Sequence, residues 1–436
     1  MQTSLSYPNL ESRLLDSFQQ GLSDPRPLVE RFSAKSATTL SANARADDEV
    51  DSAQKVLRPL FGKGSSLAPA IGDHPNFHHL KGTSDNCYCP IVTMFMDIEG
   101  STRLSLLYPL EKVQRIKNAF IQSAIRIVQS FDGHVHRIMG DAVMSFFGGV
   151  AEKSEDAIIN GVNCAAVLQH FAEHVVRPKL DEIGCDHDFG IRVGLDFGSE
   201  EDVLWSAYGY PGVEEVTATS FFVDIASKLQ HSAGRNQAMF GGSLLSTIDF
   251  PSELVTTKRV VRDGDSVLVP HVEPNHTDRD GKPVNYDQRI LKRADYLEHT
   301  PIGFTSDLYR RSSVPPIQIC ASVFAGDKTT FEGIYAAASR CLPKDRNIKF
   351  EIQMPYLPML PYNIKVKVEN HGKEAWSKNP TTGDNHESSY EIRTQEEHRG
   401  FTHWEHTKYR GLHFVIFEVR THKGLRFRSR FGVYVE

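Results

Sequence analysis

Two aspartates lie where a carboxylate can bind a metal ion. Asp97 lies near the end of the apolar run IVTMFMDI, which predicts a buried strand, and Asp141 lies in the turn of a predicted hairpin, within IMGDAVMSFFG. A carboxylate at a strand end reaches the edge of its sheet, where Mg²⁺ and similar hard cations take oxygen ligands. If the hairpin pairs beside the first strand, the two carboxylates converge. Two cations held there would clamp an in-line displacement at phosphorus.

The residues that follow Asp97 favour a phosphate-sized ligand beside these cations. Gly100, Ser101 and Thr102 open a predicted helix, whose first backbone N–H groups point toward an anion. Glycine at position 100 also lets the backbone approach a ligand closely. Taken singly, Asp97 is equally well explained as a helix cap and Asp141 as an ordinary turn residue. Their joint placement favours the metal site.

The elements that must position these residues run as strand, helix, hairpin, helix and strand between about residues 91 and 198. This order predicts a ferredoxin-like α+β domain, in which one face of the sheet is left open to a partner. Residues 1–88 predict a helical extension and a linker, with apolar side chains at helical spacing in the first 45 residues. The predicted α+β domain covers 89–265.

A second domain is expected after a linker at 266–314. Residues 315–436 alternate apolar and polar side chains with a period of two, as in NIKVKVEN, LHFVIFEVR and RFRSRFGVYVE. This pattern predicts an all-β, sandwich-like domain.

The composition narrows the classes of function. The chain has 436 residues and a formal net charge of −6, which predicts no basic face for stable binding of nucleic acid. No run of apolar residues is long enough to cross a bilayer, and the start lacks the pattern of a signal peptide, so we expect a cytoplasmic protein. Six cysteines are too few for a disulfide framework.

The pair FMDIEGST and RIMGDAVMSFFG resembles the catalytic domain of the class III nucleotide cyclases. This resemblance implies that Asp97 and Asp141 bind two divalent cations, Mg²⁺ or Mn²⁺, with the backbone carbonyl of Ile98 as a third ligand. It also implies a homodimer with shared active sites and a nucleoside triphosphate as the substrate.

Base selection in that family involves the residue four positions before the second metal aspartate, here Arg137. Arginine offers only donors, so it suits the acceptor atoms of a pyrimidine: O2 and N3 of cytosine, or the carbonyls of uracil. The alternative is a surface arginine on a strand. The resemblance places Thr217 at the second position that contacts the base.

The segment FFVDIASKLQ resembles the family helix V-N-x-A-x-R, but with two departures. Asp224 occupies the asparagine position, and Lys228 occupies the position of the arginine that stabilises the transition state. Lysine still supplies a positive charge, whereas an aspartate cannot replace an amide beside phosphate. The structural alternative is an amphipathic dimer helix with an Asp224–Lys228 ion pair. Lys282 is a weak candidate for the residue that binds the triphosphate.

The C-terminal region resembles the sensor-like β-domain of the bacterial Pycsar pyrimidine cyclases of antiphage defence. The implied reaction is cyclisation of UTP, the first choice, or of CTP to the 3′,5′-cyclic monophosphate, which then activates a separate effector protein. An adenylyl cyclase and a catalytically inactive nucleotide-binding sensor remain as alternatives.

Overall fold

The computed structural model describes residues 9–23, 52–67, 70–185, 189–305, 314–354 and 356–436. Part of the predicted N-terminal helical extension, residues 24–45, lies outside these residues. The α-helices are α1 (Leu10–Ser23), α3 (Ser52–Leu60), α4 (Ser101–Leu107), α5 (Leu110–Ser130), α6 (Ser154–Phe171), α7 (Arg177–Glu182), α8 (Phe221–Ser232), α9 (Gly242–Thr247), α10 (Arg293–Leu297), α12 (Lys373–Lys378) and α13 (Gln395–Arg399).

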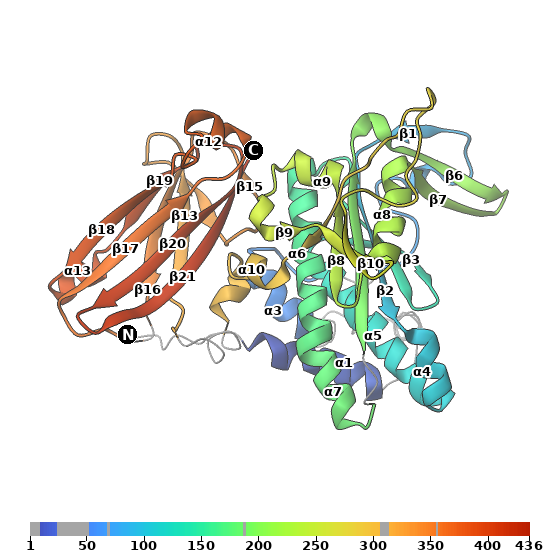
Figure 1. The fold of residues 1–436 in the computed structure, drawn as a ribbon, viewed down its shortest axis with the longest axis horizontal. Helices are drawn as coiled ribbons and strands as arrows, with labels where there is room; N and C mark the ends of the chain where they lie inside the picture. Colours follow the sequence, from blue (N-terminus) through green and yellow to red (C-terminus); the bar gives the residue numbers. More distant parts are fainter. Residues whose placement is uncertain (1–8, 24–51, 68–69, 186–188, 306–313, 355) are drawn as a thin grey trace, which may run out of the picture.

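The strands form an N-terminal and a C-terminal group (Figure 1). The first group is β1 (Asn86–Tyr88), β2 (Ile91–Glu99), β3 (His134–Met139), β4 (Ala142–Phe147), β5 (Gly190–Gly198), β6 (Leu204–Tyr210), β7 (Val213–Thr219), β8 (Gln237–Gly241), β9 (Val255–Thr256), β10 (Lys258–Arg262), β11 (Asp265–Val269) and β12 (Gln288–Leu291). The second is β13 (Gln318–Phe324), β14 (Phe331–Tyr335), β15 (Cys341–Leu342), β16 (Asn347–Gln353), β17 (Tyr362–Glu369), β18 (His386–Ile392), β19 (His403–His406), β20 (Gly411–Thr421) and β21 (Gly424–Val435).

A seven-stranded sheet in the order β3-β4-β2-β5-β8-β12-β9 forms the centre of the N-terminal part. Strand β2 pairs with β4 on one side and with β5 on the other, antiparallel in both cases. The predicted order of strand, helix, hairpin, helix and strand is confirmed, and so is the α+β class.

The two faces of this sheet are covered differently. Val92 and Leu195 pack against Gly161 of α6, where an added Cβ would lie 3.2 Å from Val92 and 3.3 Å from Leu195, a tight contact. On the other face α8 lies so close to β5 that a Cβ on Gly194 would fall 2.2 Å from the backbone of Gln230. Because side chains alternate along a strand, Asp97 and Gly194 project to this same face, the α8 face.

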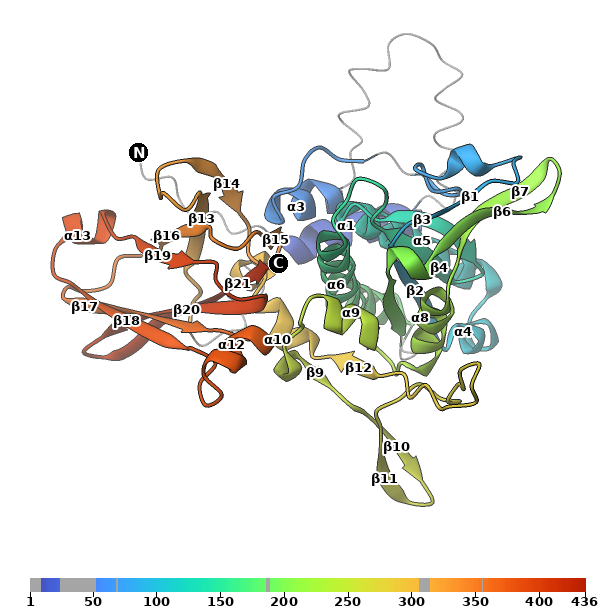
Figure 2. The same cartoon turned by 90° about the horizontal axis from the view of Figure 1, so that it is seen from above.

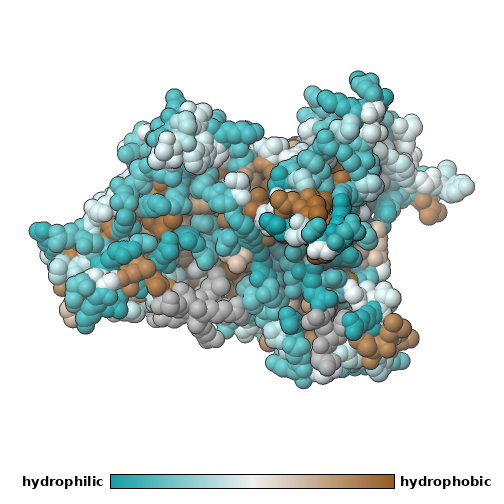
Figure 3. Space-filling view, viewed as in Figure 1, coloured by the Kyte–Doolittle hydropathy of each residue, from teal (hydrophilic) through white to brown (hydrophobic). Residues whose placement is uncertain are grey.

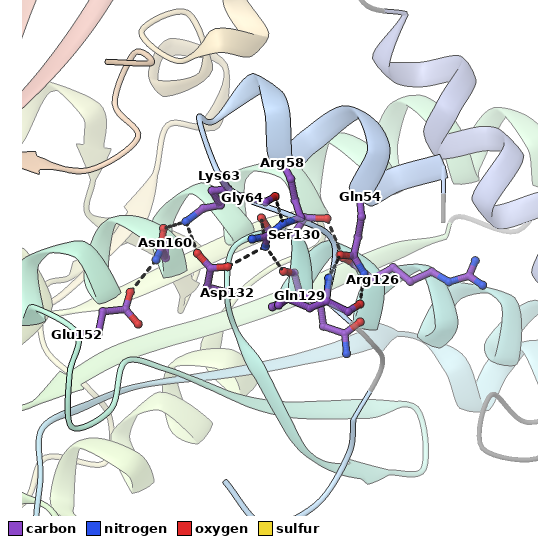
Figure 4. Close-up of polar contacts among 11 residues, drawn as sticks. Gln54, Arg58, Lys63, Gly64, Arg126, Gln129, Ser130, Asp132, Glu152 and Asn160 are labelled. Atoms are coloured by element: carbon purple, nitrogen blue, oxygen red, sulfur yellow. Dashed lines mark hydrogen bonds and ion pairs between the residues drawn. The ribbon is translucent and has the colours of Figure 1, made fainter. Parts of the chain in front are cut away.

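The N-terminal helices are docked on the first domain through a polar network (Figure 4). Arg58 at the end of α3 forms an ion pair of 2.7 Å with Asp132, in the turn before β3, and Lys63 contacts the other oxygen of Asp132 at 2.7 Å. Lys63 also donates to Asn160 of α6, whose amide donates to Glu152 at 2.9 Å. The extension therefore helps to fix the turn from which β3 begins.

Glu152, at the end of this network, makes the stability of the protein depend on pH. Desolvation by burial, only partly offset by the charge of Lys63, raises the pKa of its carboxyl group from 4.5 to about 7. Between these pH values the folded protein keeps this proton while the unfolded chain loses it, so stability falls as the pH rises through the window.

We therefore expect Glu152→Gln to melt at the wild-type temperature at pH 4, below both pKa values, and at a higher temperature at pH 8. The gain in free energy of unfolding at pH 8 should reach at most about 3 kcal/mol, since each pKa unit corresponds to about 1.4 kcal/mol. Thermal melts at both pH values test this, with the exposed Glu182→Gln as control. An equal difference at both pH values would argue against the titration.

The range 266–314, expected as a linker, contributes to the first domain. Strand β12 pairs with β8 and β9 inside the seven-stranded sheet. The β10–β11 hairpin, by contrast, projects away from the body of the protein (Figure 2). Residues 306–313 of this range lie outside the described part.

The C-terminal part is a sandwich of two sheets, with strand orders β14-β13-β16-β19 and β15-β21-β20-β17-β18. Their inner faces share one apolar core that includes Ile319, Phe350 and Phe417. The predicted all-β sandwich is thereby confirmed, because the alternating pattern places one side chain in two between the sheets.

Buried contacts join the sandwich to the first domain. Tyr296 donates a hydrogen bond of 2.8 Å to Asn163 of α6, and Asn163 in turn donates to the carbonyl of Ala338 at 2.8 Å. Leu412 and Phe414 of β20 belong to the same apolar core as α6. The two domains therefore share a continuous interior rather than a flexible contact.

Candidate active site

Asp97 lies near the end of β2, directly opposite Arg192 of β5. The guanidinium group holds both carboxylate oxygens, with Nε to Oδ1 at 3.1 Å and Nη2 to Oδ2 at 2.6 Å. This hydrogen bond raises the pKa of Arg192 above its ordinary value, and the charges of Asp97, Glu99 and Asp141 act in the same direction. Asp97 and Asp141 are thus both within electrostatic reach of one guanidinium group.

Asp141 lies in the β3–β4 turn, next to the same edge of the sheet. The register of β2 and β4 pairs Met96 with Val143, so Asp97 and Asp141 lie one and two residues beyond this pair. The nearest cation to Asp141 is Lys117 of α5, with Nζ 4.0 Å from Oδ1. The topology therefore brings the two predicted carboxylates to one edge, each beside a positive charge.

The ligand atoms of these residues are of the type that binds a divalent cation. Two carboxylates and the carbonyl of Ile98, next to Asp97, are hard oxygen ligands of the type that Mg²⁺ and Mn²⁺ prefer over the nitrogen and sulfur ligands of zinc sites. Arg192 and Lys117 supply positive charge beside the two carboxylates. In the described part of the chain, no third His, Cys, Asp or Glu side chain joins them in a cluster that could hold a metal.

The predicted phosphate-side residues open helix α4. Gly100 has a φ of 70° at the N-cap position, a conformation that glycine adopts without strain. Ser101 is buried, and Thr102 is exposed at the start of the helix. Glu99, just before them, pairs with Arg235 at 3.2 Å.

Helix α8 presents Asp224 and Lys228 on the side that faces away from the sheet. Asp224 is exposed. Lys228 makes its contact with His276, where Nζ lies 2.6 Å from Nε2, rather than with Asp224 as in the structural alternative. His276 comes from the long connection between β11 and β12, and the ring of Phe221 of α8 lies near it. Lys282 lies further along that connection, in a turn around Asp278.

Arg137 and Thr217 are brought together through a third residue. Arg137 of β3 donates from Nε to Glu215 Oε1 at 2.9 Å, and its Nη2 contacts the same oxygen. Glu215 and Thr217 are two residues apart on β7, so their side chains project from the same face of that strand.

Three residues beside the predicted ones carry no strong signal in the sequence. Arg192 shares the mostly apolar strand GIRVGLDFG with one other charged residue, Asp196, and this pattern does not reveal that Arg192 pairs with Asp97. Glu214 and Glu215 are adjacent and identical in type, so the sequence distinguishes them only by the alternation that places Glu215 on the same strand face as Thr217. His276 lies in a polar connection where no pattern singles it out.

The chain is 34% identical over 444 residues to a cytidylate cyclase of Escherichia coli, an alignment that covers 98% of this chain and 95% of the relative. The chain belongs to this family of class III nucleotide cyclases. A second member, a cytidylate cyclase of Staphylococcus aureus, is 33% identical over 364 residues, which cover 82% of this chain and 81% of that one. The chain is accordingly a nucleotide cyclase.

The C-terminal domain of this cyclase also matches a known family. Residues 299–436 match the adenylyl/guanylyl and SMODS C-terminal sensor domain. The match begins before the predicted boundary at 315. It begins just after α10, which ends at Leu297, and includes the whole sandwich.

Solved cyclase structures are similar to about half of the chain. The adenylyl cyclase CyaB from P. aeruginosa aligns with a TM-score of 0.38 and 17% identity over 48% of this chain and 95% of that one. The guanylyl cyclase Cya2 aligns with a TM-score of 0.35 and 18% identity, covering 44% and 95%.

Proposed function

We propose that this nucleotide cyclase converts CTP into 3′,5′-cyclic CMP and pyrophosphate at the shared sites of a homodimer. The observation that carries the proposal is the convergence of Asp97 and Asp141 at one sheet edge, in a chain closely related over its whole length to cytidylate cyclases. The names of these relatives favour CTP, whereas the sequence alone put UTP first.

The reaction forms one bond and breaks one. The ribose 3′-oxygen attacks the α-phosphorus and loses its proton to solvent, while the bond from that phosphorus to the bridging oxygen of the β-phosphate breaks and pyrophosphate leaves. Two divalent cations, when bound, would lower the pKa of the 3′-hydroxyl and neutralise the leaving group.

The side chains of the protein then have distinct roles. Asp97, Asp141 and the carbonyl of Ile98 would hold the cations, beside the positive charges of Arg192 and Lys117. The Nε and Nη2 donors of Arg192, which contact Asp97, would then be able to donate to the triphosphate. Lys228, held by His276, would face the phosphate of the partner's site and stabilise its transition-state charge. Arg137 and Thr217 would bind the base.

Exposed apolar surface supports the homodimer. Tyr210 and Val213, at the tip of the β6–β7 hairpin, have exposed fractions of 83% and 81%, and Leu106 of α4 has 83%. The space-filling view shows apolar surface at this hairpin and around α4 (Figure 3). Isolated apolar residues on a surface are common, but large ones on a projecting hairpin favour burial against a second copy.

The biological setting follows from the proposed product. A cyclic pyrimidine nucleotide made beside a sensor-type domain fits a second messenger in antiphage defence, which would act on a separate effector protein. CTP is a cytoplasmic metabolite, and we place the reaction there. In the part of the chain that the structure describes, no helix has the length and apolar character of a membrane span.

Incubation of the protein with ATP, GTP, CTP and UTP in the presence of Mn²⁺, followed by mass spectrometry, tests this proposal. Cyclic CMP is expected as the main product. Cyclic UMP as the main product would overturn the choice of base, and cyclic AMP would favour the adenylyl cyclase alternative. If none of the four nucleotides yields a cyclic product, the protein is better described as a nucleotide-binding sensor.

A further inference from the structure

Glu215 is the acidic residue that lies closest to the proposed base-binding side chains. Its carboxylate contacts both Arg137 and His136 of β3, and all of these contacts involve Oε1. Within the described residues, Oε2 is left without a hydrogen bond. Arg137 and Glu215 have side-chain exposed fractions of 44% and 37%, so a ligand can reach them.

His136 fixes the carboxylate from the buried side. Its side chain is fully buried, and its Nδ1 lies 3.0 Å from the carbonyl oxygen of Gly72, so Nδ1 must carry a proton and donate it. Its Nε2 lies 2.5 Å from Glu215 Oε1, within ion-pair distance although outside hydrogen-bond angles.

Arg137 and Glu215 together present hydrogen-bond donors and one acceptor to solvent. Arg137 supplies a fork of N–H donors, and Glu215 supplies one free carboxylate oxygen that can only accept. The pyrimidine edge of cytosine offers two adjacent acceptors, O2 and N3, followed by the N4 amino donor. Uracil offers acceptor, donor, acceptor. The order of two donors and one acceptor matches cytosine without leaving a group unpaired.

We infer that Glu215 determines the choice of cytosine, by accepting a hydrogen bond from the N4 amino group while Arg137 donates to O2 and N3. This inference rests on the proposed function and names a specificity residue for it. Carboxylates are suitable acceptors for the cytosine N4 amino group. A uracil bound in the same orientation would place its O4 against the carboxylate, where two acceptors repel.

The variant Glu215→Gln tests this assignment. Glutamine keeps an oxygen for Arg137 and His136, but adds an amide N–H₂ that can donate to uracil O4. We expect the ratio of kcat/KM for CTP to that for UTP to fall by about tenfold or more, since a site loses discrimination when a buried polar pairing changes sign. Glu214→Gln is the matched control, because its side chain lies on the opposite face of β7 and its ratio should stay at the wild-type value.

The outcomes separate the inference from the proposed function. If wild-type protein forms no cyclic pyrimidine nucleotide, the proposed function fails. If wild-type protein forms cyclic CMP but Glu215→Gln lowers both rates equally, Glu215 only holds Arg137 in place and the inference is overturned. Size-exclusion chromatography and circular dichroism of both variants establish that they remain folded.

Discussion

Replacing Asp97 or Asp141 by asparagine is expected to lower the rate of cyclisation by a factor on the order of 10³ or more. Asparagine keeps the shape of the side chain but removes the negative charge that a divalent cation requires. The two carboxylates lie at one edge of the sheet, so either loss should disable the same cation site. Initial rates with CTP and Mn²⁺ measure the effect.

Glu99→Gln is the matched control for these two variants. Glu99 is a carboxylate at the same edge, but it is paired with Arg235 and has no proposed contact with a cation. Its variant should keep activity within about threefold of wild type, because an exposed ion pair contributes little. A folded Asp97→Asn or Asp141→Asn protein with full turnover would contradict the assigned role.

The second large effect is a recovery of activity when two inactive variants are combined. Lys228→Ala should lower the rate by about 10², the usual cost of removing one group that stabilises transition-state charge. Each shared site takes Asp97 from one chain and Lys228 from the other. In a heterodimer of Asp97→Asn and Lys228→Ala chains, both substitutions therefore fall in one site. The other site keeps Asp97 of the Lys228→Ala chain and Lys228 of the Asp97→Asn chain. Such a heterodimer should therefore show about half of the wild-type rate, because a two-fold dimer has two equivalent sites.

The control for complementation is a heterodimer of Asp97→Asn and Asp141→Asn chains. Both lesions then affect the cation side, so each of the two sites carries one of them and activity should stay low. Coexpression with two different affinity tags isolates each heterodimer. If Asp97→Asn and Lys228→Ala chains show no recovery in a folded heterodimer, Lys228 does not act across the interface.

The sequence predicted those parts of the fold and site that depend on local patterns. Asp97 could be assigned because an apolar run of strand length ends at it, and Asp141 because glycine and aspartate define a hairpin turn. The period of two in the C-terminal third was sufficient to predict the sandwich. Each of these signals lies within a few consecutive residues.

The remaining parts depend on register and on contacts between distant segments. Arg192 holds Asp97 because the β2–β5 register places the two directly opposite each other, which no local pattern reveals. Glu215 meets Arg137 only where the β6–β7 hairpin approaches β3. Strand β12 was expected within a linker because four residues give too short an apolar pattern, and it is its pairing with β8 that makes it a strand.

The measurement that tests the central claim most directly is the position of Mn²⁺ in crystals grown with a non-cyclisable CTP analogue, located by anomalous scattering. The account predicts two Mn²⁺ ions bound by both Asp97 and Asp141, with the base of the analogue beside Arg137 of the other protomer. Mn²⁺ bound elsewhere while the analogue is in place, with Asp97 still paired to Arg192, would contradict it.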